Sequence, residues 1–207
     1  MSSTRMTKPQ RREQILATAA EVFATTGYAH AGMREVATRA GITTPVLYDH
    51  FASKADLYSV LLGKQVDSLV GEWAAPVAPV STYDLFHGRV CSIYAWIEQN
   101  ELAWRMIFGE PPRDEDAARV HREGQARATR HLTALFRSVP HLDLSVDLDR
   151  DRADEVLAEA AKSALNAIAT WWWSNRDVSR EHVVALTTDL LWRGVRELTG
   201  SASHVRH

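Results

Sequence analysis

The side chains best suited to chemistry lie on both sides of a tight turn at Ala40-Gly41-Ile42-Thr43. The apolar spacing of residues 36–40 predicts a short helix closed by the glycine of this turn. Thr43 is a good N-cap for the next helix, because Pro45 then lies in its first turn, where a missing N–H is no loss. Two helices joined in this way form a helix-turn-helix, whose second helix can enter the major groove of DNA. The chemistry expected here is contact with nucleotides.

Side chains that could read bases lie mainly in the first turn of the second helix. Thr44 could hydrogen-bond a base, and Pro45 and Val46 could contact a thymine methyl group. Simple helix initiation is the alternative role of Pro45 and Thr44. Arg34, on the first helix of the pair and outside its apolar pattern, could bind guanine through two nitrogens, although a phosphate contact or a surface ion pair would suit the same position. Thr43, the N-cap residue, joins these four residues among the candidate DNA-binding residues.

A second set of side chains could donate hydrogen bonds to phosphates: Tyr48, His50 and Lys54. Such contacts set the register of a protein on DNA and carry no base information. Tyr48 could instead be a half-buried aromatic residue of the core. The DNA-binding prediction therefore rests on one set of residues for bases and another for the backbone.

Charge is distributed unevenly along the chain. Residues 1–54 hold seven basic and four acidic side chains, a net charge of +3, whereas 17 basic and 22 acidic side chains give residues 55–207 a net charge of −5. Lys8, Arg11 and Arg12 place positive charge at the start of the first helix. A basic head favours an anionic partner, although an excess of three charges also fits a merely solvated surface.

The elements that must position these residues all have helical periodicity. Apolar residues recur on one face of residues 10–26, which Gly27 ends, and Ser53 with Asp56 predicts the start of a long fourth helix that reaches a break at residues 75–79. No segment is convincing as a strand. The predicted fold is all-α, with a three-helix helix-turn-helix domain at residues 1–54 and a helical domain at 55–207. Its further helices are predicted at 81–99, 101–108, 114–139, 152–174 and 180–199.

A longer pattern runs from Arg11 to Tyr58. Its matching residues are Arg12, Ile15, Ala19, Phe23, Gly27-Tyr28, Val36-Ala37, Ala40-Gly41-Ile42-Thr43, Leu47-Tyr48-Asp49-His50-Phe51, Ser53-Lys54 and Leu57. This pattern strongly resembles the N-terminal domain of the TetR/AcrR family of bacterial transcriptional repressors. The resemblance implies phosphate contacts by the matched tyrosine and lysine, and an effector-binding and dimerisation domain at 55–207. Ala31-Gly32 departs from the hydroxyl pair of many members, so a hydroxyl contact to phosphate is in doubt there, whereas backbone N–H groups remain available.

The last two predicted helices each carry a large apolar face. A lone pair of helices leaves one face uncovered, and pairing with a two-fold mate would bury both in a four-helix bundle, the homodimer that the resemblance implies. Successive residues diverge by ~100° around a helix, so Trp171, Trp172 and Trp173 cannot all point inward. At least one should meet a partner subunit or a ligand, unless it is simply exposed. The two faces are Val156, Leu157, Ala160, Ala164, Leu165, Ile168 and Trp172, and Val183, Leu186, Leu190, Leu191, Val195 and Leu198.

The resemblance also implies a cavity for a small-molecule effector between the fourth and the eighth helix. The composition of this region favours a mostly apolar, partly aromatic effector, with a few side chains available for hydrogen bonding. Packing in the core is the alternative role of every aromatic residue here, and burial is expected for Cys91. The candidate effector-binding residues are Trp73, Phe86, Arg89, Val90, Ile93, Tyr94, Trp104, Phe108, His121 and His131.

The sequence patterns of common enzymes fail. Residues 27–32 have the glycine spacing of a phosphate loop, but Met33-Arg34 replaces the required Lys-Ser/Thr and no strand precedes them. His121-Arg122-Glu123 resembles the start of a zinc deaminase site, but the Pro-Cys-x-x-Cys that would complete it is missing. We therefore expect no enzymatic activity, no cofactor and no metal.

The remaining expectations concern place and mode of action. No stretch is long and apolar enough to cross a bilayer, and the basic N-terminus lacks the apolar core of a secretory signal. With a single cysteine, these features predict a cytoplasmic protein without a membrane partner. We expect a repressor that binds a palindromic operator in double-stranded DNA as a dimer and is released by its effector; activation is also open. The alternative is a helical small-molecule-binding protein whose head docks another protein.

Overall fold

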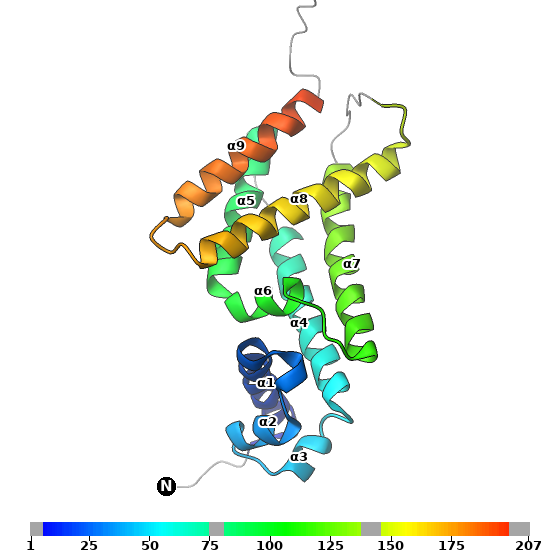
Figure 1. Ribbon diagram of the computed structural model, residues 1–207, viewed down its shortest axis with the longest axis vertical. Helices are drawn as coiled ribbons and strands as arrows, with labels where there is room; N and C mark the ends of the chain where they lie inside the picture. The colour runs from blue at the N-terminus through cyan, green and yellow to red at the C-terminus, as the bar shows by residue number, and fades with distance from the viewer. Residues whose placement is uncertain (1–5, 75–80, 138–145, 199–207) are drawn as a thin grey trace, which may run out of the picture. The chain divides into compact units, whose positions relative to one another are not determined.

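The computed structural model describes residues 6–74, 81–137 and 146–198, with the side chains of all but 73, 74, 82, 135, 136 and 195–198. Within these ranges every regular element is a helix, which confirms the predicted all-α fold (Figure 1). The helices are α1 (Lys8–His30), α2 (Met33–Arg39), α3 (Thr44–Tyr48), α4 (Lys54–Ala74), α5 (Thr82–Gln99), α6 (Glu101–Phe108), α7 (Glu115–Arg137), α8 (Arg150–Trp173) and α9 (Arg180–Leu198).

The chain forms two compact units. The first comprises Met1–Ser68 and Asn100–Gln125, and the second comprises Leu69–Gln99 and Ala126–His207. α4 and α7 therefore contribute residues to both units. Compactness does not decide where the DNA-binding function ends, so the domain boundary after residue 54 stays a prediction.

Local sequence signals set the helix ends of the first unit. Thr7 caps α1, because its hydroxyl accepts from the Gln10 N–H at 3.4 Å while the Gln10 side chain accepts from the Thr7 N–H at 2.9 Å. The predicted break at Gly27 is present: this residue adopts a φ of 72° inside α1, outside the helical region. The Ser53 hydroxyl accepts from the Asp56 N–H at 3.0 Å, as predicted for the start of α4.

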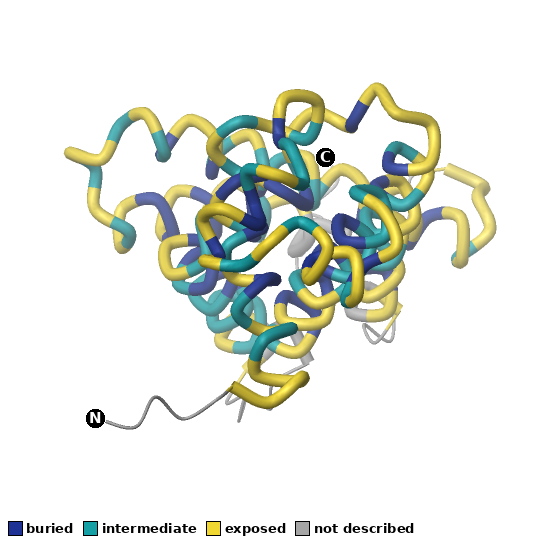
Figure 2. The backbone as a smooth tube through the Cα atoms, turned by 90° about the horizontal axis from the view of Figure 1, so that it is seen from below, coloured by how far each residue is buried: buried dark blue, intermediate teal, exposed yellow. Residues whose placement is uncertain are grey.

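The core of the first unit lies between the apolar faces of its helices. α1 packs against α2 and α6, and α2 packs against α3. Buried and exposed stretches alternate along these helices, as Figure 2 shows and as amphipathic helices require. Tyr58 of α4 places its ring edge-on to Phe23 and Tyr28 of α1, with centroids 5.5 and 5.0 Å apart. These aromatic contacts fix α4 against α1.

A buried polar chain crosses the same core. His121 of α7 is only 2% exposed, and its Nδ1 lies 3.1 Å from the hydroxyl of Tyr58. Its Nε2 lies 3.0 Å from the amide nitrogen of Gln125, which also donates to the carbonyl of Ile107 at 3.0 Å. Because the amide NH2 only donates, Nε2 of His121 is the acceptor and Nδ1 carries the proton. The ring is neutral in this arrangement, and burial lowers its pKa.

In the second unit α9 packs against α5 and α8. The buried hydroxyl of Tyr94 donates to the carbonyl of Leu165 at 3.4 Å and accepts from the hydroxyl of Thr187 at 3.2 Å, so one side chain of α5 reaches both α8 and α9. Trp172 lies edge-on to Tyr94, with centroids 6.0 Å apart, and its indole N–H donates to the carbonyl of Val178 at 2.8 Å. This cluster forms the polar and aromatic centre of the unit.

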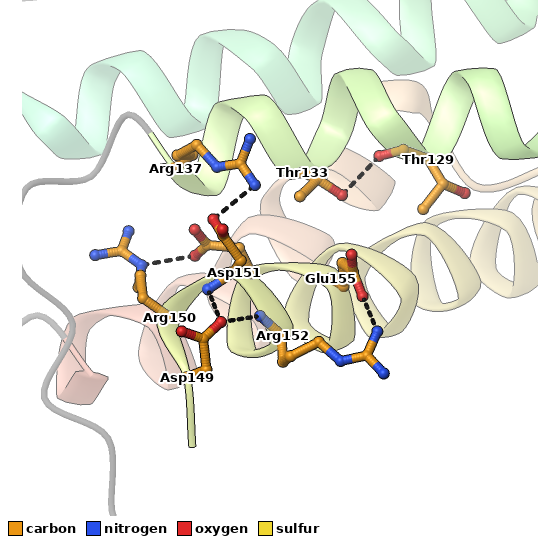
Figure 3. Close-up of polar contacts among 9 residues, drawn as sticks. Thr129, Thr133, Arg137, Asp149, Arg150, Asp151, Arg152 and Glu155 are labelled. Atoms are coloured by element: carbon orange, nitrogen blue, oxygen red, sulfur yellow. Dashed lines mark hydrogen bonds and ion pairs between the residues drawn. The ribbon is translucent and has the colours of Figure 1, made fainter. Parts of the chain in front are cut away.

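Polar contacts join the end of α7 to the start of α8 (Figure 3). The guanidinium of Arg137 binds the carboxylate of Asp151 at 2.7 Å, and Arg150 binds the fully buried Asp154 at 2.9 Å. Asp149 caps α8, because its carboxylate accepts from the N–H groups of residues 151 and 152. α8 therefore begins two residues before the predicted start at Arg152, since the side chain that caps it comes earlier.

Two negative findings concern the described residues only. None of their helices combines the length and the hydropathy needed to cross a membrane. The same residues include no group of three or more histidine, cysteine or acidic side chains arranged to hold a metal ion.

Candidate nucleic-acid interface

The turn between α2 and α3 has the conformation that the sequence predicts. Gly41 adopts a φ of 65°, a left-handed conformation that favours glycine. Its N–H donates to the carbonyl of Thr38 at 3.1 Å, and the N–H of Ile42 donates to that of Ala37 at 3.0 Å. These two bonds form a Schellman motif, which satisfies the last carbonyls of α2 and redirects the chain into α3.

α3 has one buried and one exposed face. Leu47 is fully buried, whereas Val46 and Tyr48 are 36% and 50% exposed. Pro45 is also exposed, and Thr44 is half-buried. Tyr48 is therefore a surface residue in this structure and not part of the core. The first turn of α3 is open to a partner, as base contacts would require.

Thr43 holds the N-cap position of α3 with extended backbone, as predicted, but its side chain makes no capping hydrogen bond to a described residue. The main chain supplies the first helical bond instead, because the carbonyl of Thr43 accepts from the N–H of Leu47 at 3.1 Å. The Thr43 side chain is exposed. A hydroxyl that does not cap its own helix remains free to contact a nucleotide.

Arg34 lies exposed on α2, one residue after its start. The other arginine of this helix, Arg39, pairs with Glu35 at 2.7 Å. The Arg34 side chain thus lies on the surface of α2, the helix that precedes α3. A base, a phosphate or an acidic side chain could bind it there. Its role stays a prediction.

His50 follows α3 and is half-buried. Its carbonyl accepts from Nη1 of Arg12 at 2.6 Å, and the guanidinium lies 4.1 Å from the ring centroid of Phe51. Burial lowers the pKa of His50, and the positive charges of Lys8 and Arg12 lower it further. The imidazole is therefore kept neutral, a form that still donates one hydrogen bond to a phosphate.

Arg12 has a role that the sequence prediction missed. We expected charge near the DNA backbone, but the half-buried guanidinium holds the chain at the end of α3. Two residues further on, the amide of Gln14 donates to the carbonyl of Ala40 at 3.1 Å, at the end of α2. α1 thus donates hydrogen bonds to the carbonyl groups that follow α2 and α3. No local signal indicates these contacts, because the paired residues lie 38 and 26 positions apart.

Lys54, at the first position of α4, is half-buried and faces the end of α1. Its ammonium lies 4.3 Å from the ring centroid of Tyr28 and donates to the carbonyl of Ala29 at 3.4 Å. Burial lowers the pKa of Lys54, and the nearby carboxylate of Asp114 opposes this effect. In this structure the predicted phosphate-binding amine is already engaged within the protein.

The candidate effector residues belong to both compact units. Trp104 and His121 are buried and Phe108 is half-buried in the first unit; in the second unit Val90, Ile93 and Tyr94 are buried, Phe86 and Arg89 are half-buried, and His131 is exposed. The side chain of Trp73 lies outside the described residues. Tyr94 and His121 already have hydrogen-bond partners within the protein. The effector site stays a prediction.

Cys91 is half-buried, less than expected, with its sulfur 3.4 Å from Nε2 of His87. Burial raises the pKa of the thiol. A protonated thiol is a weak nucleophile, so this pair gives no support to a catalytic cysteine.

A short helix with one buried face, one open face and a glycine turn that joins it to its bracing helix defines a helix-turn-helix DNA-binding protein. Comparisons with known proteins agree with this class. Residues 15–61 match the model of the bacterial regulatory proteins, tetR family.

Relatives match over nearly the full chain. The HTH-type transcriptional activator FasR of Mycolicibacterium smegmatis is 29% identical over 194 residues, which cover 92% of this chain and 85% of FasR. A TetR-like transcriptional regulator from Rhodococcus sp. RHA1 has the same fold, with a TM-score of 0.72, 19% identity and coverage of 92% and 98% of the two chains. The fatty acid degradation regulator FadR from Bacillus halodurans gives a TM-score of 0.69 at 16% identity over 91% and 96%. Residues 15–61 thus carry the DNA-binding domain of the tetR family of regulatory proteins, and the chain has the fold of TetR-like regulators over nearly its full length.

Proposed function

We propose that the chain binds a palindromic operator as a homodimer and releases or rearranges it when a small-molecule effector binds. The observation that carries this proposal is the open face of α3, where Val46 and Tyr48 are exposed opposite the fully buried Leu47. A two-fold dimer presents two such helices, so the half-sites of the operator should lie about one helical turn, ~34–36 Å, or a multiple apart.

Exposed apolar side chains on α8 and α9 support the dimer. Val156 and Trp171 of α8 are 61% and 53% exposed, and Leu186 and Leu190 of α9 are 68% and 63% exposed. Large apolar side chains in such number on two adjacent helices favour burial against a second copy. The faces predicted from sequence mix inward and outward residues, since Leu165, Trp172 and Val183 are buried within the unit. The side chains of Val195 and Leu198 lie outside the described residues.

The effector is proposed to be small and mostly apolar, as the composition of the predicted residues favours. A ligand that binds one conformation of the dimer better than the other shifts the population towards it, and DNA that prefers the other conformation weakens ligand binding by the same factor. Such a population shift is sufficient to couple effector binding to DNA binding without a chemical reaction at either site.

Repression is the proposed direction of regulation, because a protein that leaves its operator on binding an effector relieves a block. Activation is the second candidate, and one observation favours it: FasR, which matches 92% of this chain, is named an activator. The position of the operator relative to the promoter separates the two. An operator that overlaps the promoter supports repression, and one upstream of it supports activation.

Selection of genomic fragments by the purified protein, followed by footprinting, tests the proposal. We expect a protected palindrome and a logarithmic affinity that falls with log salt by about 0.9 per phosphate contacted. A flat salt dependence would indicate that the head docks another protein and would contradict the proposal.

Two variants then separate base contacts from phosphate contacts. Arg34→Ala should cost about 1–3 kcal/mol on the operator and relax the preference at one base pair. Lys54→Ala should weaken operator and random duplexes alike. Equal losses of Arg34→Ala on both duplexes would assign Arg34 to a phosphate.

A further inference from the structure

The first unit has a cleft of about 480 Å³ that brings acidic side chains to the start of α4. Its walls come from the end of α1, the start of α4, the segment that joins α6 to α7 and the first turn of α7. Lys54 and Arg113 contribute positive charge, and Asp114 and Asp116 contribute negative charge. The predicted phosphate-binding amine therefore shares a cleft with two carboxylates of its own chain.

Tyr28 stands between the amine and one of these carboxylates. Its ring lies beneath the ammonium of Lys54, and its hydroxyl donates to Oδ1 of Asp114 at 3.5 Å. The ring is held in turn by Phe23, stacked with centroids 5.9 Å apart, and by the edge-on Tyr58. Tyr28 therefore packs in the aromatic cluster and contacts both Lys54 and Asp114.

Electrostatic interactions also hold the Lys54 ammonium in the cleft. The carboxylate of Asp114 raises the pKa of Lys54 against the effect of burial, so its negative charge stabilises the ammonium in the cleft. A cation over an aromatic ring is attracted to it as well. A DNA phosphate that binds Lys54 must replace or share these interactions.

We propose that Asp114 is a positioning residue for DNA binding that acts through Lys54: its carboxylate, with the Tyr28 ring, holds the ammonium in the cleft and competes with a backbone phosphate for it. The proposal rests on the proposed phosphate contact of Lys54. It makes the segment between α6 and α7 a determinant of affinity for DNA of any sequence, since phosphate contacts carry no base information.

Asp114→Asn tests the competition. Oδ1 of Asp114 also accepts from the N–H of Ala117 at 3.0 Å and so caps α7. Asparagine caps a helix as well as aspartate does, so this variant removes the charge and keeps the cap. By fluorescence anisotropy we expect about two- to fivefold tighter binding to operator and random duplexes alike, the range of a partly exposed charge interaction.

Glu115→Gln is the matched control. Glu115 is the neighbouring exposed residue and does not line the cleft, yet its substitution changes the net charge equally. We expect Asp114→Asn to tighten binding more than Glu115→Gln does. In a Lys54→Ala background the two substitutions should have equal effects. Equal effects in the natural chain, or a surplus for Asp114→Asn that persists without Lys54, would overturn the inference.

A second variant guards against loss of fold. Tyr28→Phe keeps the aromatic ring and removes the hydroxyl contact to Asp114, so it should tighten binding in the same direction by a smaller factor. Weaker binding by a folded Tyr28→Phe protein would count against the competition. Absence of binding to every duplex would refute the proposed function itself, whereas normal binding without coupling between Asp114 and Lys54 would refute this inference alone.

Discussion

Arg12 donates a hydrogen bond of 2.6 Å to the carbonyl of His50, 38 residues further along the chain. Its guanidinium also covers the ring of the buried Phe51. α3 has only five residues, too few to be stable as an isolated helix. Its position therefore depends on contacts of this kind, so Arg12 helps to decide how α3 is presented on the surface.

Arg12→Ala should lower the free energy of unfolding by about 1–3 kcal/mol, because a charged hydrogen bond to a half-buried carbonyl is lost. Denaturant unfolding measures the change, and affinity for DNA should fall with it. Arg11→Ala is the control: its side chain bonds only to Gln14 among the contacts described, so a change within about 0.5 kcal/mol is expected. Equal losses of unfolding free energy in both variants would mean that the positive charge, and not the contact to His50, stabilises the protein.

Two glycine substitutions should have opposite effects. Gly41→Ala forces a side chain onto a left-handed φ of 65° and should cost about 1–2 kcal/mol. At Gly63 of α4 an added Cβ would meet none of the described atoms within 4 Å, so alanine should stabilise the helix by about 1 kcal/mol. Thermal unfolding compares them. If bending at Gly63 transmits the effector signal, Gly63→Ala also reduces the response; unchanged stability and response would dismiss that hypothesis.

His121 should make stability depend on pH. Its pKa in the folded protein lies below the ordinary value of 6.5, so the unfolded chain takes up a proton first as the pH falls. The folded protein is therefore most stable above pH 6.5, where His121 is neutral in both states. Its free energy of unfolding decreases as the pH falls from 6.5 through the lower folded pKa, by at most about 1.4 kcal/mol per pH unit. Urea unfolding between pH 7.5 and 5 (about the range in which histidine titrates) measures it. His121→Asn should reduce the pH dependence and leave the part due to His50, whose pKa is also lowered, whereas substitution of the exposed His30 should not change it. An unchanged profile in His121→Asn would assign the effect elsewhere.

Leu190→Lys tests the proposed dimer face. Leu190 is 63% exposed, so its substitution should leave the fold of one chain intact. In a two-fold dimer it removes two buried leucines, each contributing about 1.5–3 kcal/mol, and should raise the dissociation constant by at least about 100-fold. Sedimentation equilibrium measures it. Val146→Lys, at an equally exposed apolar position outside α8 and α9, should leave association unchanged; dimers that persist in Leu190→Lys would place the interface elsewhere.

Much of the turn motif could be predicted from residues alone because its causes are local. The left-handed φ of Gly41, the cap position of Thr43 and the cap of α4 by Ser53 depend on a few neighbouring residues. Boundaries were less certain: α8 starts at Arg150, since Asp149 caps it from before the periodic stretch.

The site beyond the turn could not be predicted in the same way. Lys54 was assigned to a phosphate, and the sequence contained no sign that Tyr28 and Asp114 surround it. The candidate effector residues share composition, yet they divide between two compact units. Composition cannot distinguish a wall of a cavity from a packed core, because the same aromatic and aliphatic side chains build both.

The order of residues by itself determined that this chain is helical and where α3 begins, because glycine turns, capping and apolar periodicity act within one or two turns of a helix. Only the tertiary structure decided which distant groups hold that helix and Lys54, the lysine predicted to bind a phosphate. The contacts of Arg12 with His50, of Lys54 with Ala29 and of Tyr28 with Asp114 join positions 38, 25 and 86 residues apart, and no local pattern encodes such separations.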